Sequence, residues 1–249
     1  MICSITIVRY PNWLGWAGFL SMALFRLPLM FNKEISFWKL MGTGKNGSFD
    51  KTPDLSQWAI LVIDQTEPTS QFPTWSEPLK PDKAHDYLKN RYGIFIAAWW
   101  RFFNCETWTI LLEPIEGHGL WDGKQPFGPV PMKSDYEGPI AILTRATIKI
   151  SKLKDFWGNV DKVASRMAGA PGFKTSFGIG EVPWIKQATF SIWSSKADMK
   201  AFAYQMQEHA TVIAKTRKEK WYSEDLFMRF RPLGSFGKVK GLDPLKQNP

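Results

Sequence analysis

Residues 188–231 read ATFSIWSSKADMKAFAYQMQEHATVIAKTRKEKWYSEDLFMRFR, and this stretch decides the fold. Its first six residues alternate as a strand does, so that Ser191 and Trp193 share one face. A helix is expected over 196–218, because one set of residues recurs there at steps of three and four: Met199, Phe202, Met206, His209 and Ile213. A strand is expected at 226–233. The stretch therefore predicts strand, helix and strand, with one histidine on an otherwise apolar helical face.

The same reading extends outward to the rest of the chain. In the second half we expect strands at 140–150, 173–180, 187–193 and 226–233, with helices at 153–168 and 196–218. In the first half we expect strands at 5–10, 35–42, 58–64 and 107–113, with helices at 12–30 and 82–101. Each half then has the order β-α-β-β-α-β of a ferredoxin-like unit. A weak internal repeat supports the duplication, since Phe37, Met41, Gly42 and Gly44 lie 136 residues before Phe173, Phe177, Gly178 and Gly180.

The expected fold class is therefore α+β, with two ferredoxin-like β-α-β-β-α-β units in one chain forming a dimeric α+β barrel-like architecture. The expected boundaries are 1–115 for the N-terminal unit, 116–139 for a Gly/Pro-rich connecting loop, 140–233 for the C-terminal unit and 234–249 for a flexible tail. The glycines at 42–47 superficially resemble a phosphate loop. They lack its GK[ST] ending and its strand-to-helix context, which favours turn and close-approach roles.

Composition bounds the class of protein. The chain has 249 residues, 44% of them hydrophobic and 22% charged, which is typical of a globular protein. Two cysteines, Cys3 and Cys105, cannot form a disulfide framework and indicate a reducing compartment. The N-terminus lacks the basic region of a signal peptide, and the apolar run 13–25 is too short to span a membrane. We expect a cytoplasmic protein whose first helix is a core helix, with a membrane-surface helix as the alternative.

Charge is unevenly distributed along the chain. Residues 141–249 carry 19 Lys and Arg against 9 Asp and Glu, whereas the whole chain has a net charge of +9. A basic half suits an anionic cofactor, an anionic membrane surface or a solvated basic face. No nucleic-acid-binding signature accompanies it, so we expect no nucleic-acid partner.

Three histidines are candidates for a metal or catalytic role. His85 lies on a polar helical face. His118 lies between two glycines in the connecting loop, where it could contact a substrate or support a metal ligand. His209 alone lies among apolar neighbours on a helix. A lone histidine in that setting is usually a hydrogen-bonded core residue, so the pattern by itself favours the core role.

Several blocks resemble the spheroidene monooxygenase family over nearly the whole chain: FWKLMGTG (37–44), GHGLWDG (117–123), LTRATI (143–148), GIGEVPW (178–184), TFSIW (189–193) and WYSEDLF (221–227). The resemblance implies a haem-containing oxygenase of carotenoid biosynthesis. Such an enzyme introduces a keto group into an acyclic carotenoid by successive hydroxylations. It also implies an electron-donor protein, because the chain carries no flavin or nicotinamide fingerprint of its own.

From this resemblance, and by analogy with other haem enzymes that have a related barrel, we predict His209 as the axial ligand of the haem iron. Aldoxime dehydratases and dye-decolourising peroxidases, which have a related barrel, use a histidine from the second unit; this is an argument from fold alone. The cofactor is expected to be non-covalent haem b, since no Cys-x-x-Cys-His occurs. Residues predicted to contact it are Arg145, Trp193, Phe202, Met206 and Arg229.

Catalytic roles are predicted for two of the residues near this site. Arg145 is the first candidate for a distal or propionate-binding group, and a surface arginine is the alternative. Ser191 could line the pocket with Trp193, and ordinary core is the alternative. Arg229 and Arg231 could meet propionates or solvent. A Cys105 thiolate ligand is disfavoured, because no cation lies beside it in the sequence.

Two other functions remain open at this point. One is a haem-dependent dehydratase of the aldoxime type, or another nitrogen–oxygen chemistry, on the same scaffold. The other is a non-enzymatic barrel that binds haem or a small ligand. A homodimer is possible under each reading, although an internal duplication makes it unnecessary for closing a barrel.

Overall fold

The structure is a computed structural model that describes residues 1–45, 52–64, 81–205, 215–216 and 218–245. The chain divides into two compact units, which are described separately. Unit 1 holds residues 1–43, 54–113 and 232–246, and unit 2 holds 44–53, 114–231 and 247–249. In this division residues 116–139 fall in unit 2 and residues 234–246 fall in unit 1, and the expected domain bounds stay a prediction.

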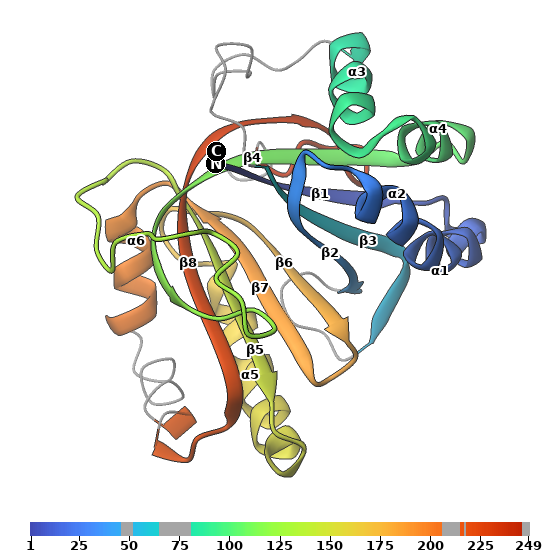
Figure 1. The fold of residues 1–249 in the computed structure, drawn as a ribbon. Coiled ribbons are helices and arrows are strands. Elements are labelled where there is room, and N and C mark those ends of the chain that lie inside the picture. Colours follow the sequence, from blue (N-terminus) through green and yellow to red (C-terminus); the bar gives the residue numbers. More distant parts are fainter. Residues whose placement is uncertain (46–51, 65–80, 206–214, 217, 246–249) are drawn as a thin grey trace. The chain divides into compact units, whose positions relative to one another are not determined.

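Unit 1 is built on four strands: β1 (Ile2–Arg9), β2 (Ile35–Gly44), β3 (Pro53–Asp64) and β4 (Glu106–Gly119). They lie in the order β4-β1-β3-β2, and β1 is antiparallel to both of its neighbours. The connections hold a 3₁₀ turn and four helices, which Figure 1 shows: η1 (Asn12–Leu14), α1 (Gly15–Leu24), α2 (Arg26–Phe31), α3 (Pro81–Tyr92) and α4 (Ile94–Phe102).

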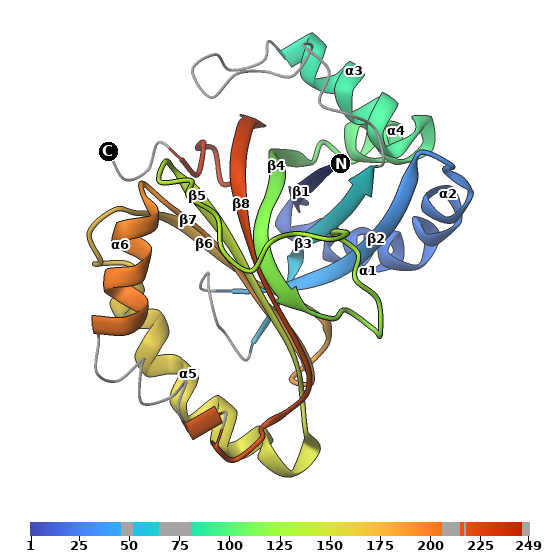
Figure 2. The same cartoon turned by 60° about the vertical axis from the view of Figure 1, so that its left-hand side comes forward.

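Unit 2 repeats the same order of elements. Its strands are β5 (Ile140–Ile148), β6 (Phe173–Val182), β7 (Lys186–Trp193) and β8 (Tyr222–Gly237), in the sheet order β8-β5-β7-β6. Its helical elements are η2 (Ile150–Lys152), α5 (Leu153–Met167), α6 (Lys196–Lys200) and a π-helical turn, η3 (Ala201–Gln205). Helices α5 and α6 lie on the same side of the sheet (Figure 2). The fold is thus a mixed α+β fold of antiparallel strands and helices.

The order β-α-β-β-α-β expected from the sequence is the observed order in each unit. That these are ferredoxin-like units, and that they close into one barrel, stay predictions. Element ends differ more. Strand β4 runs on to Gly119 through the start of the expected loop, and β8 runs on to Gly237 into the expected tail.

Both long helices expected in unit 1 are broken in two. Gly93 separates α3 from α4 with φ = +88°, a conformation that glycine adopts without steric cost. Helix α1 ends at Leu24, four residues before Pro28, because proline has no N–H to donate to the carbonyl of Leu24. Helix propensity predicted both segments, and single glycine and proline residues decided where each one stops.

The core of unit 1 lies between its sheet and these helices. Val8, Ile60 and Val62 from the sheet pack with Phe25, Tyr92 and Trp100 from the helices. The two buried hydroxyls of β1 are satisfied within the unit, since Thr6 Oγ1 lies 2.6 Å from Tyr92 Oη and 2.8 Å from Thr109 Oγ1, and Ser4 Oγ accepts from Arg91 Nε (3.1 Å). Strand β1 can therefore be buried on both faces without an unpaired hydroxyl.

Candidate functional site

The helix-covered face of the unit 2 sheet carries three of the predicted site residues. On β7, Thr189, Ser191 and Trp193 point to this face, because side chains alternate along a strand. The register extends the face to β5 and β8, where Ile142 lies opposite both Ser191 and Arg229, and Thr144 lies opposite both Thr189 and Phe227. Ser191, Trp193 and Arg229 therefore share one face of one sheet.

Aromatic side chains fill one end of this face. The ring of Trp193 lies 5.2 Å from that of Phe202 in η3 and 5.4 Å from that of Phe173. Met199, Met167, Ile140 and Ile142 complete the cluster. Trp193 Nε1–H donates to Ser191 Oγ at 3.0 Å, so the Ser191 hydroxyl accepts one bond and keeps its own proton to donate.

The helix cover has an opening at Thr144. Its neighbours on the same face of β5 are buried, Ile142 beside the α6 cluster and Ile148 beside Phe156 and Trp157 of α5, whereas Thr144 is exposed. Next to it, the buried Oγ1 of Thr189 has no hydrogen-bond partner among the described residues. Leaving a buried hydroxyl without a partner is costly, so Thr189 Oγ1 is suited to one further hydrogen bond. We call Thr144, Thr189 and Phe227 the Thr144 opening.

His118 borders the same opening. Its ring stacks on Phe227 with centroids 5.8 Å apart, and its side chain is exposed. The glycines on either side explain how it reaches this place, because a Cβ on Gly117 would meet Met228 Sδ at 2.3 Å and one on Gly119 would meet Asp225 O at 2.3 Å. A cavity of about 190 Å³ also borders this segment, and residues 125–130 and Met132 line it. Its β8 side chains are Leu226 and Met228, which are one residue out of step with Phe227, so the cavity is not part of the Thr144 opening.

A buried ion cluster lies at the Arg229 end of the helix-covered face. The Glu116 carboxylate accepts from Lys196 Nζ at 2.8 Å, from the backbone N–H of Ser134 at 2.7 Å and from Arg229. Glu116 and Lys196 are each 1% exposed. Two cations thus share one carboxylate, and Arg229 Nε has no partner among the described residues. Burial lowers the pKa of Arg229. The cluster has a net positive charge and could accept a further anionic group.

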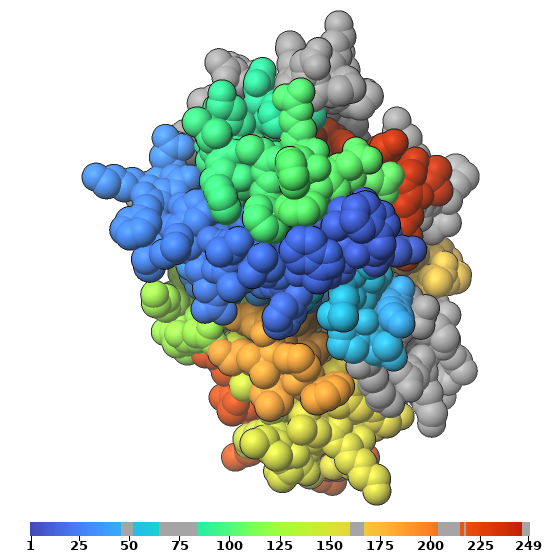
Figure 3. All heavy atoms as spheres, turned by 90° about the vertical axis from the view of Figure 1, so that its right-hand side faces the viewer, coloured from blue at the N-terminus to red at the C-terminus, as the bar shows by residue number. Residues whose placement is uncertain are grey.

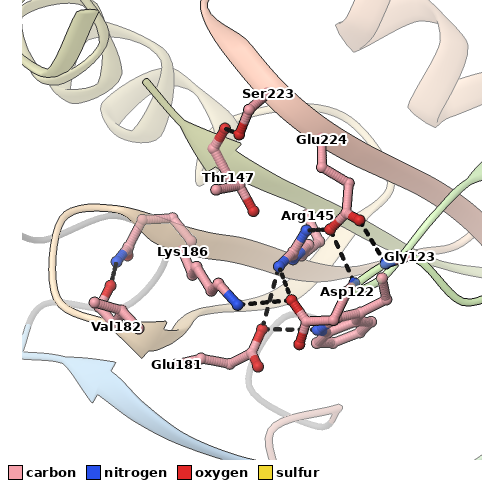
Figure 4. Close-up of polar contacts among 11 residues, drawn as sticks. Asp122, Gly123, Arg145, Thr147, Glu181, Val182, Lys186, Ser223 and Glu224 are labelled. Carbon is pink, nitrogen blue, oxygen red and sulfur yellow. Dashed lines mark hydrogen bonds and ion pairs between the residues drawn. The ribbon is translucent and has the colours of Figure 1, made fainter. Parts of the chain in front are cut away.

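Arg145 lies on the opposite face of the sheet. It is opposite Ala188 and Leu226, one residue out of step with Ser191 and Arg229. Its guanidinium, 1% exposed, is bound by the carboxylates of Asp122 (3.1 Å), Glu181 (3.6 Å) and Glu224, as Figure 4 shows. The structure therefore does not bring Arg145 together with Ser191, Trp193 and Arg229.

The Arg145 cluster holds one tight turn in place. Glu224 accepts from the backbone N–H groups of Asp122 (2.9 Å) and Gly123 (2.7 Å), and Trp121 Nε1–H donates to Glu181 at 2.7 Å. Asp122 and Gly123 both have positive φ, 51° and 72°. Although burial opposes it, these backbone bonds and the Arg145 charge lower the pKa of Glu224. The GHGLWDG block is thus a turn clamped by carboxylates.

The other predicted residues lie elsewhere. His209 and Met206 are outside the described residues, although α6 and η3 lead directly into that segment. His85 is half-buried on α3 in unit 1, and Arg231 is exposed. Cys3 and Cys105 are free thiols, and burial raises the pKa of each to about 12, which keeps both protonated. No group of three metal-ligating side chains occurs in the part of the chain that the structure describes.

Sequence reasoning missed Glu116, Lys196, Thr144 and Thr189. The two charged residues gave no signal, because they are 80 residues apart in sequence and meet only in the fold. Thr189 lies inside the TFSIW block, and its position two residues before Ser191 could have placed it on the same face.

Comparison with known proteins gives three relatives named spheroidene monooxygenase. The protein of Rhodobacter capsulatus is 32% identical over 246 residues, 98% of this chain and 95% of the relative. That of Rubrivivax gelatinosus is 30% identical over 217 residues, 86% of this chain and 75% of the relative. That of Cereibacter sphaeroides is 34% identical over 221 residues, and the chain spans only 63% of its length. No family model matches the chain.

Two solved structures of aldoxime dehydratase share the fold. One, a complex with butyraldoxime, has a TM-score of 0.57 at 8% identity and covers 94% of this chain and 79% of its own. The other has a TM-score of 0.53 at 6% identity and covers 94% and 81%. Identities this low show a common fold and carry no information about activity.

Proposed function

The chain belongs to the spheroidene monooxygenase family, and from that membership we propose that it is a haem-b-dependent monooxygenase acting on a long, apolar, carotenoid-like substrate. The observation that carries the proposal is the 32% identity that runs along 95% of the Rhodobacter capsulatus protein. The substrate is expected to be hydroxylated successively at one carbon, which ends in a ketone.

The helix-covered face of unit 2 is where we place the haem. Its side chains fit a flat, apolar group with acidic substituents. Trp193 and Phe202 make one end of this face apolar and aromatic, the Thr144 opening leaves part of the sheet uncovered, and Thr189 Oγ1 is a buried hydroxyl that lacks a partner among the described residues. Haem bound there would supply the activation of O₂ and the oxidation of a C–H bond.

The ion cluster suits the propionates of the cofactor. Arg229 and Lys196 carry two positive charges against the single charge of Glu116, and Arg229 Nε is available for one more hydrogen bond. A carboxylate added to this cluster would balance its charge and would be held by charge-assisted bonds. Arg145 has no part in this proposal, because it is on the other face and already meets three carboxylates.

His209 is proposed as the axial iron ligand. It lies in the segment that continues from α6 and η3, and Phe202 of η3 already contacts Trp193 on the helix-covered face. A π-helical turn such as η3 is often found at functional sites. The remaining imidazole nitrogen would need an acceptor to orient the ring.

Ser191 is proposed to act as a hydrogen-bond donor on the sheet side of the haem. Its hydroxyl accepts from Trp193, which fixes the oxygen and directs its own proton elsewhere on the same face. The aromatic cluster around Trp193 would exclude water from that side. His118, stacked on Phe227 at the rim of the Thr144 opening, is placed to contact an apolar substrate or a proton-carrying water.

Electrons are proposed to come from a separate ferredoxin or reductase, because the sequence has no flavin or nicotinamide fingerprint. The dehydratase alternative would need no such donor. The shared fold supports this alternative, and no observation at the site favours it. Oxygen-dependent oxidation of an acyclic carotenoid, compared with anaerobic turnover of an aldoxime by the ferrous protein, distinguishes the two.

The visible absorption spectrum of the purified protein after haem addition tests the proposal. We expect a Soret band in the parent chain that shifts or disappears in His209→Ala and is unchanged in the matched variants His85→Ala and His118→Ala. A band that changes only in His118→Ala would move the iron ligand to His118. The absence of a band in every variant, the parent included, would overturn the haem proposal.

A further inference from the structure

Large apolar side chains are exposed together on the helices of unit 1. Ten of the seventeen exposed large apolar side chains in the described part of the chain lie on two segments, seven within 12–31 and three within 94–103. Their exposed fractions run from 41% to 81%: Trp13, Trp16, Phe19, Leu20, Leu27, Met30, Phe31, Ile94, Phe95 and Phe102. We call this set the α1–α4 face. Exposed apolar clusters of this size mark interaction sites.

The two segments form one surface because α4 packs beside α1 and α2. The ring of Phe103 lies 5.9 Å from that of Trp16, and the ring of Phe25 lies 6.2 Å from that of Phe95. Figure 3 shows the two segments, dark blue and green, side by side on one side of the molecule. The exposed side chains therefore share one continuous apolar area.

The other side of the same helices is held in the core of unit 1. Ala17 and Phe25 are fully buried, and Leu14 and Leu29 are at most 5% exposed. By length and composition alone, Asn12–Phe31 could cross a membrane, and a third of its most apolar 18-residue stretch is buried. Because that buried third packs against the sheet of unit 1, the segment is suited to lying on a membrane rather than crossing it.

Charge on the α1–α4 face has one sign. Arg26 is the single charged residue in 12–31, and Arg101 is the single charged residue in 94–103. Both are exposed. Tryptophan and phenylalanine with basic residues and no acidic ones are typical of helices that lie in the interface of an anionic bilayer.

We propose that the α1–α4 face docks onto the surface of an anionic lipid bilayer. The aromatic side chains would enter the boundary between headgroups and acyl chains, and Arg26 and Arg101 would pair with lipid phosphates. A second copy of the chain is a poorer partner. In a two-fold dimer this face would meet itself, so both arginines would face an apolar surface whose two segments hold no carboxylate. The inference does not depend on the oxygenase proposal.

Flotation with vesicles tests the inference on the full-length purified protein. We expect the parent chain to float with 7:3 POPC/POPG vesicles and to bind pure POPC vesicles more weakly. The combined variant Trp13→Glu, Phe31→Glu and Phe102→Glu removes three of the most exposed aromatic side chains. It should bind at least about tenfold more weakly, since each change replaces buried apolar area with a charge. Ile150→Glu, at a 76% exposed site in unit 2, is the matched control and should bind as the parent does.

A second variant tests the charge. Arg26→Glu with Arg101→Glu should abolish the preference for POPG vesicles and leave the circular dichroism spectrum unchanged, because both side chains are exposed. Failure of the parent to float with POPC/POPG vesicles would overturn the inference. Equal vesicle binding by the parent and the triple-glutamate variant would also overturn it. So would a dimer of the parent chain, detected by sedimentation velocity, that the triple-glutamate variant dissociates. No haem or substrate is needed, so each of these results is independent of the proposed activity.

Discussion

Arg145 and Arg229 are both buried arginines of the unit 2 sheet, and they have different surroundings. Arg145 meets three carboxylates and so has more negative than positive charge around it. Arg229 shares the single carboxylate of Glu116 with Lys196. The Nε of each arginine lacks a hydrogen-bond partner among the described residues, so the two differ in charge balance. The surplus of carboxylates around Arg145 suits a structural clamp, whereas the surplus positive charge around Arg229 suits an anionic ligand. Arginine content alone could not distinguish the two.

At the residue scale, Glu224→Gln tests the structural role of Arg145. Because the pKa of Glu224 is lowered from its ordinary 4.5 in the folded chain, its stabilisation is fully present above that value and is lost as pH falls through the folded pKa. We expect Glu224→Gln to have a lower free energy of unfolding than the parent at pH 7. This difference should shrink as pH falls below 4.5. Urea unfolding between pH 7 and pH 3 measures this.

The effect should be modest, because Glu224 is partly exposed and solvent screens its ion pair. Glu137→Gln, at an exposed site in the same unit, is the control and should show no such pH dependence. If the free energies of unfolding of the parent and Glu224→Gln differ by the same amount at pH 7 and pH 3, the ionic clamp is contradicted. The Soret band of the haem-loaded variant should be unchanged, since Arg145 faces away from the proposed haem.

At the scale of elements, single residues set the ends of helices that the hydrophobic pattern predicts. The pattern gave one helix over 82–101, and the structure has two with Gly93 between them. It gave strands where β4 and β8 lie, and both run several residues further. Backbone pairing with a neighbouring strand can extend a strand through polar or glycine-containing sequence, and no local signal reports that pairing.

Gly93→Ala and Gly158→Ala form a matched pair at this scale. A Cβ at either position meets nothing within 4 Å, so neither change creates a clash. At Gly93, φ is +88°, and alanine there should cost about 1–2 kcal/mol of unfolding free energy. At Gly158, inside α5, alanine should stabilise by about 0.5–1 kcal/mol. Thermal unfolding of both variants gives the comparison, and a destabilised Gly158→Ala would refute the helical assignment.

At the scale of the whole molecule, the two units have the same order of elements and different surfaces. Unit 2 carries the helix-covered face with its ion cluster, and unit 1 carries the α1–α4 face. The division suits an enzyme whose substrate is apolar, because a bilayer can supply the substrate while the chemistry takes place elsewhere in the chain. The two proposals are independent, so their variants can be combined.

The combination gives a prediction for the whole chain. The variant with Trp13, Phe31 and Phe102 changed to glutamate should keep the Soret band and should oxidise carotenoid dispersed in detergent at the parent rate. With carotenoid dissolved in POPC/POPG vesicles, its rate should fall about in proportion to its loss of vesicle binding. Oxygen consumption in the two media measures this. An equal loss in both media would show that the changes damage the fold or the site rather than docking.

The sequence by itself determined the order of elements in both units, the alternation that places Ser191 with Trp193, and membership of a family. It could not determine which residues of neighbouring strands share a face. Arg145 was grouped with Ser191 from the sequence, and the register places them on opposite sides of the sheet. A shift of one residue in strand pairing exchanges the two faces of a strand, and only pairing in the folded sheet fixes it. The same holds for Glu116, Lys196 and Arg229, which are far apart in sequence and acquire their shared charge only when packing brings them together.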